Sequence, residues 1–174
     1  MARLAGAMAA CAVIGYFPYV KGTDVPFLGL FDFGIHELGH MLFIWAGHTV
    51  HFLAGSVMQV VVPVGFAVLF FLWGNLPAVA VTTAWTGASL YDVSVYVADA
   101  PYQRLQLWGG GQHDWATLLG DWGMISAADE IAAGLSLLGG VLVVAAMALC
   151  AVPAFIPAAA DLPVRLPSLR QMAS

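Results

Sequence analysis

Charged residues are scarce in this chain. Aspartate, glutamate, lysine and arginine make up 9% of its 174 residues, against about 25% in an ordinary globular domain. A soluble protein of this length cannot cover its surface with so few charges. Hydrophobic residues make up 61% of the chain, and its mean hydropathy is +0.89. The composition therefore predicts a membrane protein that is in contact with lipid.

Basic residues and cysteines are also few. The five lysines and arginines are not clustered, which argues against nucleic-acid binding, since that needs a basic surface. Cys11 and Cys150 both lie in apolar runs. They are typical of small buried hydrophobic residues, and two cysteines so placed exclude a disulfide framework and a cysteine-based zinc site.

Apolar runs divide the chain into about five segments that are long enough for membrane helices. These cover residues 2–19, 27–46, 52–73, 78–97 and 131–152. The first is expected to be a retained helix, because no clean small-x-small cleavage site follows it. The long polar stretch is 99–130, where Asp114 is expected to cap a short helix at the membrane interface.

The expected fold class is therefore all-α. It is a polytopic membrane helix bundle with about five transmembrane segments and one interfacial loop or short helix. Residues 1–153 form a single membrane-embedded domain, and the Pro-rich residues 154–174 form an irregular C-terminal tail.

One motif in this apolar chain carries chemistry. It is an HExxH motif that runs from His36 to His40, inside the apolar segment 27–46. On a helix, positions i and i+4 share a face, so both imidazoles can reach one metal ion. Glu37 lies in the same turn and is the candidate general base toward water.

The two histidines also have other possible roles. They could belong to a polar network, or could bind a pigment or haem. Two imidazoles at i and i+4 approach from the same side, however, and cannot be opposite axial ligands of one haem. Ionisable groups inside membrane segments are costly and are candidates for function. Asp32 lies on the same stripe as His36 and His40, and we expect a bound Zn²⁺ here.

A hydrolytic zinc site needs three protein ligands and one open position, so HExxH leaves one ligand to be found. The candidates are Asp92, Asp99, His113, Asp114, His48 and His51. Asp92 and Asp99 are seven residues apart and share a helix face. His113 and Asp114 are expected as an outer pair, in which a carboxylate orients an imidazole.

The motif and its surroundings support a resemblance. Phe33 to His40 reads Phe-x-x-His-Glu-Leu-Gly-His and is followed two segments later by an aspartate. Over residues 27–100 the chain resembles the site-2 protease family of intramembrane zinc metalloproteases. The resemblance implies a zinc ion held by His36, His40 and a distal aspartate, with Glu37 as general base.

The distal part of the resemblance is less complete. The family's aspartate follows an asparagine and a proline and precedes a glycine, and all three are missing around Asp92 and Asp99. Asp99 is the better positional match and Asp92 the second choice. The chain also resembles small bacterial membrane proteins that pair such a helix with a downstream His-Asp-Trp, here His113 to Trp115.

Two functions are consistent with these features. The first is an intramembrane, zinc-dependent peptide-bond hydrolase that acts on a transmembrane protein substrate, expected in a bacterial inner membrane. The alternative is a non-catalytic structural or accessory subunit of a larger membrane protein complex that retains a metalloprotease-like fold. Its partners would then be the other subunits.

Overall fold

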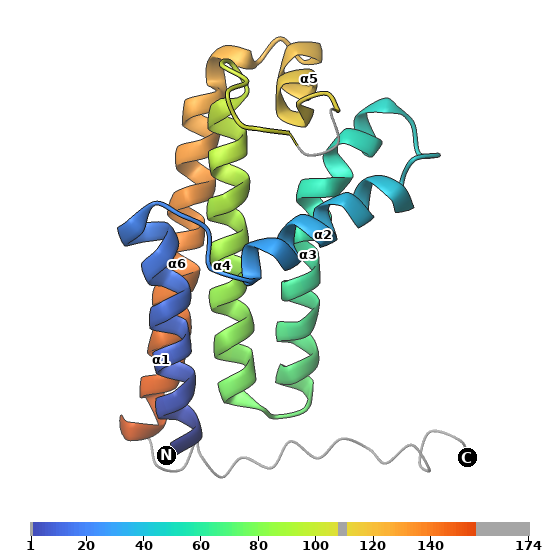
Figure 1. Cartoon of the computed structure of the whole chain (residues 1–174). Helices are drawn as coiled ribbons and strands as arrows, with labels where there is room; N and C mark the ends of the chain where they lie inside the picture. Colours follow the sequence, from blue (N-terminus) through green and yellow to red (C-terminus); the bar gives the residue numbers. More distant parts are fainter. Residues whose placement is uncertain (1, 108–110, 156–174) are drawn as a thin grey trace, which may run out of the picture.

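The computed structural model describes residues 2–107 and 111–155, and this part of the chain is helical without strands. Its helices are α1 (Ala2–Tyr16), η1 (Phe17–Lys21), α2 (Leu28–Leu42), α3 (His48–Leu72), α4 (Leu76–Asp99), α5 (Asp114–Asp121), η2 (Ile125–Ala127) and α6 (Ala128–Phe155). Figure 1 shows α1, α3, α4 and α6 running along one another, with α2 crossing α3 obliquely. The short helix α5 lies at the end of the bundle opposite the N-terminus (Figure 1).

Three helical stretches are long and apolar enough to cross a membrane: Ala2–Lys21, His48–Leu72 and Ile125–Ala151. They are fewer than the five segments expected. The helix α2 has only 15 residues, which is about 22 Å against a hydrocarbon core of about 30 Å. The 24-residue helix α4 is long enough, but its threonines, serines and Asp92 lower its hydropathy.

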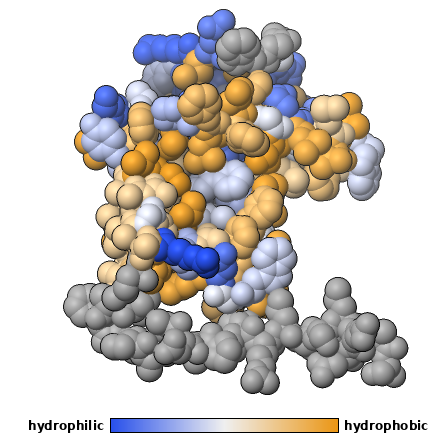
Figure 2. Space-filling view, turned by 60° about the horizontal axis from the view of Figure 1, so that its bottom comes forward, coloured by the Kyte–Doolittle hydropathy of each residue, from blue (hydrophilic) through white to orange (hydrophobic). Residues whose placement is uncertain are grey.

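The outer surface of the bundle is apolar. Large hydrophobic side chains such as Leu137 and Val144 on α6 are 71% and 66% exposed, which suits a lipid environment and not water. In Figure 2 hydrophobic residues cover most of the middle of the face shown. The Pro-rich tail expected over residues 154–174 lies, from residue 156 onward, outside the described residues.

Glycines bring α4 and α6 into backbone contact. A Cβ atom on Gly87 would lie 2.5 Å from the carbonyl oxygen of Gly139, and a Cβ on Gly139 would lie 2.5 Å from that of Gly87. Small residues allow such close approach between helices in membranes. The hydroxyls of Thr82 and Thr86 donate to carbonyls one turn earlier on α4, at 2.8 and 3.0 Å, so these buried polar groups are satisfied.

The core beside α1 is built from small residues, including Ala7, Ala84 and Ala146. Cys11 on α1 and Cys150 on α6 are free, buried thiols in the same cluster. The prediction that both cysteines behave as small buried hydrophobic residues is confirmed.

A tight helix pair, α2 and α3, carries the HExxH motif. Gly47, with φ of +89°, lies in the turn that joins the two helices, a conformation that glycine adopts without strain. Gly39 faces α3, and a Cβ there would lie only 2.5 Å from the carbonyl oxygen of Ala54. The motif's own glycine thus lets the backbones of α2 and α3 touch.

Candidate metal centre

The two histidines of the motif lie side by side on α2. The ring centroids of His36 and His40 are 4.7 Å apart, as the i, i+4 spacing predicts. His36 is buried and His40 half-buried. Both imidazoles point between α3 and α5, because Gly39 on the same side of α2 packs directly on α3. Helix contact therefore decides which way the two rings face.

A carboxylate from much later in the chain lies beside these rings. Oδ2 of Asp114, the first residue of α5, lies 3.0 Å from Nε2 of His36 and 3.1 Å from Nε2 of His40. His36, His40 and Asp114 each offer one ligand atom, and these three atoms lie within 4.8 Å of one another. Among the described residues, this group could hold a metal ion. Tetrahedral zinc with bonds of about 2.0–2.2 Å would place its ligand atoms about 3.3–3.6 Å apart.

Two contacts hold the short helix α5 over the site, and a third caps its N-terminus. Nε1 of Trp115 donates to Oγ of Ser56 on α3, at 3.0 Å. The backbone N–H of Asp114 donates to the Tyr96 hydroxyl on α4, also at 3.0 Å. Nδ1 of His113 accepts from the N–H of Ala116 at 3.2 Å and so caps the helix. The position of Asp114 is therefore fixed by side chains on both α3 and α4.

Each imidazole also has a hydrogen-bond partner at its other nitrogen, Nδ1. Nδ1 of His36 lies 3.2 Å from Oε1 of Gln59, and Nδ1 of His40 lies 2.7 Å from the carbonyl oxygen of His51. Both partners are acceptors, so each Nδ1 carries the proton and a neutral ring presents a lone pair at Nε2. When both rings are neutral, their two lone pairs face the carboxylate of Asp114, which accepts only. Three acceptors so close together need a cation between them, which is either a metal ion or, without a metal, a proton on Nε2. An acceptor at Nδ1 is usual for metal-binding histidine.

The backbone of α3 completes the site at Gly55. A Cβ atom there would lie 2.5 Å from Nε2 of His36 and 2.5 Å from Nε2 of His40. Even a methyl group would therefore occupy the space beside the two nitrogens that would bind a metal. The group of two imidazoles and one carboxylate could hold a metal ion, and this donor set is among those that zinc accepts in proteins.

The structure brings Asp114, rather than Asp99 or Asp92, to the imidazoles. Both oxygens of Asp99 accept backbone N–H groups, from Arg104 at 3.0 Å and from Leu105 at 2.9 Å. Asp99 closes the turn after α4 and is thereby held away from α2. Oδ2 of Asp92 accepts from Nε2 of Gln59, so Asp92 reaches His36 only through that amide.

The outer pair expected at positions 113 and 114 is divided by the structure. Asp114 lies among the candidate ligands, whereas His113 caps α5 and lies beside Asp99. Nε2 of His113 is 3.4 Å from Oδ2 of Asp99 and has no hydrogen-bond partner. The His113-Asp114-Trp115 triplet was the sequence signal for Asp114, but adjacency in sequence did not tell which of its members faces the motif.

The remaining candidates have other partners. Asp32 is buried and accepts from Nε1 of Trp85 at 2.7 Å and from Oγ of Ser89 at 3.2 Å. His48 is exposed and lies 3.3 Å from Asp121. His51 contributes its carbonyl oxygen to His40, as described above. None of these three side chains belongs to the group around His36 within the described residues.

Neighbouring groups and burial shift the pKa values of Asp114 on α5 and of His113, which caps that helix. Without a metal, a proton on Nε2 of His36 or His40 bonds to the Asp114 carboxylate. Burial favours the neutral form of Asp114, but these hydrogen bonds outweigh it and lower the pKa of Asp114 to about 2. Burial lowers the pKa of His113, so its neutral ring keeps the lone pair that caps α5. Asp114 is thus an anion throughout the physiological pH range, as a metal ligand must be.

A cavity of about 1060 Å³ opens beside the site. Glu37 lines it together with His36, His40 and Asp114. Apolar side chains make up much of the remaining wall: Leu30, Phe33, Phe52, Val93, Val95, Leu105 and Leu107. Glu37 is exposed and does not bond to the imidazoles, which leaves its carboxylate free to act on a molecule in the cavity.

Comparisons with family models, with curated proteins and with solved structures give no match to this chain.

Proposed function

We propose that the chain is a zinc-dependent peptide-bond hydrolase that works inside a membrane, as its resemblance to site-2 proteases implies. One observation carries this proposal. His36, His40 and Asp114 direct three ligand atoms to one point. Nδ1 of each imidazole lies beside an acceptor oxygen, which leaves Nε2 for a metal. Zinc bound there would supply a Lewis acid and make water acidic enough to ionise near neutral pH.

The chain's own residues would do the rest. Glu37 would accept a proton from the attacking water as the new C–O bond forms. It would then give that proton to the peptide nitrogen as the C–N bond breaks. The buried walls around His36 would limit access of bulk water, which strengthens each charge interaction in the site.

The apolar cavity wall supports an apolar peptide as substrate. A segment from a membrane-spanning helix would have to unwind before it could present a carbonyl to the site, because helical peptide groups are hydrogen-bonded and shielded. Leu30 and Phe33 on α2 and Leu105 and Leu107 after α4 line the cavity and would contact such an unwound segment.

We further propose that α4 crosses the membrane together with α1, α3 and α6, in an integral membrane protein of a bacterial inner membrane. The 24 residues of α4 would reach about 36 Å, and glycine contacts join it to α6. The helix α2 is too short to cross and would enter only part of the bilayer, where neighbouring helices enclose its polar side chains.

Zinc content and cleavage test the proposal together. The protein, purified in mild detergent, should hold one zinc per chain and should cleave a peptide corresponding to an apolar membrane-spanning helix. A chelator should stop cleavage, and added Zn²⁺ should restore it. Purification without a transition metal, or with a stable larger membrane assembly and no cleavage, would favour the accessory-subunit function instead.

A further inference from the structure

Gln59 is a polar residue in the middle of the apolar helix α3, and it is only 3% exposed. Both polar groups of its side-chain amide have hydrogen-bond partners. Oε1 faces Nδ1 of His36 at 3.2 Å, and Nε2 donates to Oδ2 of Asp92 on α4. Three residues on three helices thus form one hydrogen-bonded chain that ends at a candidate metal ligand.

Asp92 decides which way the Gln59 amide points. A carboxylate oxygen accepts hydrogen bonds and has none to donate, so it faces the NH₂ end of the amide. The carbonyl end of Gln59 must then face His36. Nδ1 of His36 carries the proton that this oxygen accepts, and Nε2 keeps its lone pair. Without Asp92, the amide could rotate by half a turn and present its NH₂ group to His36, which would favour a proton on Nε2.

The other imidazole lacks this dependence. Nδ1 of His40 donates to the backbone carbonyl of His51, and a helical carbonyl cannot exchange its acceptor for a donor. Of the two ring tautomers, only that of His36 therefore depends on a side chain that is free to rotate. A change at Asp92 should act on His36 and leave His40 as it is.

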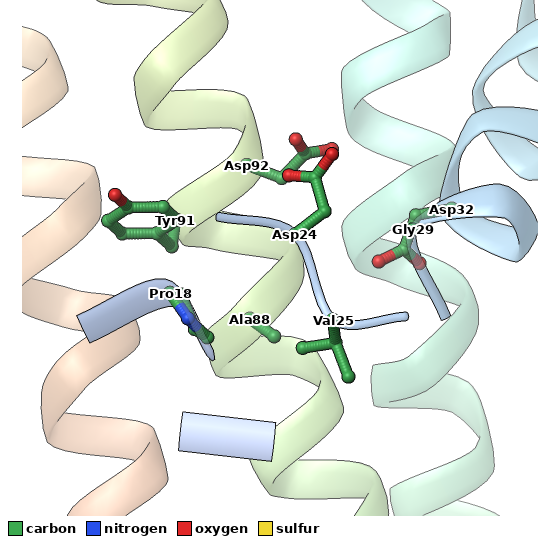
Figure 3. Close-up of a pocket in the computed structure, with 8 residues that line it drawn as sticks. All are labelled: Pro18, Asp24, Val25, Gly29, Asp32, Ala88, Tyr91 and Asp92. Atoms are coloured by element: carbon green, nitrogen blue, oxygen red, sulfur yellow. The ribbon is translucent and has the colours of Figure 1, made fainter. Parts of the chain in front are cut away.

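Asp92 contacts Gln59, whereas Asp32, a buried aspartate nearby, has different partners. Asp92 meets Asp24, which comes from the segment before α2, while the Asp32 carboxylate points away from both (Figure 3). Asp32 is bonded instead to Trp85 and Ser89. Asp92 is therefore the carboxylate that contacts Gln59, with Asp24 on its other side.

We propose that Asp92 is a positioning residue for the metal centre. It orients the Gln59 amide, which selects the His36 tautomer with a free Nε2 and so raises the affinity of the site for metal. The inference rests on the proposed metal site, but the tautomer can be observed without any metal.

Two measurements on the full chain in detergent test this role. The ¹⁵N chemical shifts of His36 in metal-free protein that carries Asp114→Ala, which removes the acceptor facing Nε2, report which ring nitrogen carries the proton of the neutral ring. They are assigned with a His36→Gln sample. Competition with a chelator gives the affinity for Zn²⁺. The variants are Asp92→Leu and the smaller Asp92→Ala, which remove the acceptor, and Asp92→Asn, which keeps an oxygen for Gln59 and offers N–H groups to Asp24.

A matched control is Ser94→Ala. Ser94 is also buried on α4, but its hydroxyl bonds only to the carbonyl oxygen of Tyr91 on the same helix. Loss of a buried polar group from α4 alone should change neither the His36 tautomer nor the zinc affinity. The control separates general loosening of α4 from the specific effect of Asp92.

With Asp92 in place, we expect the proton of the neutral His36 ring on Nδ1 in the metal-free Asp114→Ala protein. Removing the acceptor at Asp92 should move that proton toward Nε2 and weaken zinc binding by about 10–100-fold, the usual cost of losing an outer partner of a metal ligand. Asp92→Asn should stay near wild type. Gln59→Leu should weaken binding similarly, and combining it with Asp92→Leu should add little, since both act through one contact.

Two results would overturn the inference: a His36 ring protonated on Nε2 in the Asp114→Ala protein with Asp92 intact, or Asp92→Leu and Asp92→Ala variants with unchanged tautomer and zinc affinity. Equal losses in Asp92→Asn and Asp92→Leu would also contradict it. If the wild type binds no zinc but the His36 tautomer of the Asp114→Ala protein responds to Asp92 as expected, the metal site fails while the positioning role of Asp92 stands.

Discussion

Nε2 of His40 lies 3.1 Å from Oδ2 of Asp114, although 74 residues separate the two in sequence. Two helices, α3 and α4, lie between them along the chain. The contact depends on α5 being returned to the start of α3, where Trp115 bonds to Ser56. The candidate metal centre is therefore completed by the tertiary fold, and predictions about it concern both metal affinity and the placement of α5.

The first prediction concerns the third ligand. Asp114→Ala should abolish stoichiometric zinc binding, with a loss of affinity beyond the roughly 100-fold that outer partners contribute. Asp99→Asn should retain zinc, because Asp99 bonds backbone N–H groups of the following turn and not the imidazoles. Metal analysis after gel filtration measures both. Retained zinc in Asp114→Ala, with loss in Asp99→Asn, would restore Asp99 as the ligand expected from the sequence.

The second prediction concerns Glu37. Glu37→Gln should keep zinc, because Glu37 is not among the three donors. It should lower kcat by about 10²–10⁴-fold, the usual contribution of a general base. Single-turnover cleavage of the apolar peptide, measured at equal zinc content, checks this. A Glu37→Gln variant that cleaves at the wild-type rate would remove Glu37 from the assigned role.

The sequence was sufficient for the local part of the site. The HExxH spacing predicted that His36 and His40 share one face of a helix, and their rings are adjacent in the structure. Local periodicity determines such pairs, because four residues complete about one helical turn. The short helix expected at this place is also present, as α5, but its cap is wrong in the prediction: His113 caps the helix and Asp114 is its first residue.

The sequence could not supply the third partner. Only tertiary contacts bring Asp114, and not Asp99, to the imidazoles on α2. Asp99 is engaged by Arg104 and Leu105, which follow it in the turn. Asp114 is carried to the site by contacts with Tyr96 and Ser56, and neither pairing has a periodic signature.

Hydropathy predicted about five membrane-spanning segments, and three of the described helical stretches are long and apolar enough to cross a membrane. The difference at residues 27–46 has a related cause. A window of apolar residues over 27–46 does not reveal that the helix α2 begins at Leu28 and ends at Leu42. The break comes from the turn at Gly47, after which the chain reverses direction. Composition describes the environment of a segment, whereas helix length depends on where the backbone turns.

The third prediction concerns the pH dependence of the metal-free protein. The pKa of Asp114 is lowered from 3.8 to about 2 in the folded state. A lowered carboxyl pKa stabilises the fold above the unfolded-state pKa, and that stability is lost as the pH falls through the folded-state pKa. The unfolding midpoint should therefore carry an Asp114-dependent fall between about pH 4 and pH 2.

Thermal unfolding followed by circular dichroism, with and without Asp114→Asn, measures that fall. The variant should lack this part of the pH dependence. Asp121→Asn is the control, because Asp121 is an exposed residue of the same helix, 53% exposed at its side chain, where an ion pair contributes little. Identical pH profiles for wild type and Asp114→Asn would contradict the pairing of Asp114 with the two imidazoles.

The last prediction concerns Gly55, where the backbone of α3 borders the metal centre. Gly55→Ala places a methyl group 2.5 Å from Nε2 of both His36 and His40, so one or both rings must move and zinc should be lost. Gly65→Ala is the matched control on the same helix, since a Cβ there meets nothing within 4 Å. It should keep zinc and gain up to about 1 kcal/mol of helix stability from the better helix former. Zinc content and the thermal midpoint of the two variants separate the effects. Full zinc occupancy in Gly55→Ala would show that the metal does not lie between these nitrogens and α3, and only a site moved toward Glu37 and the open cavity would remain.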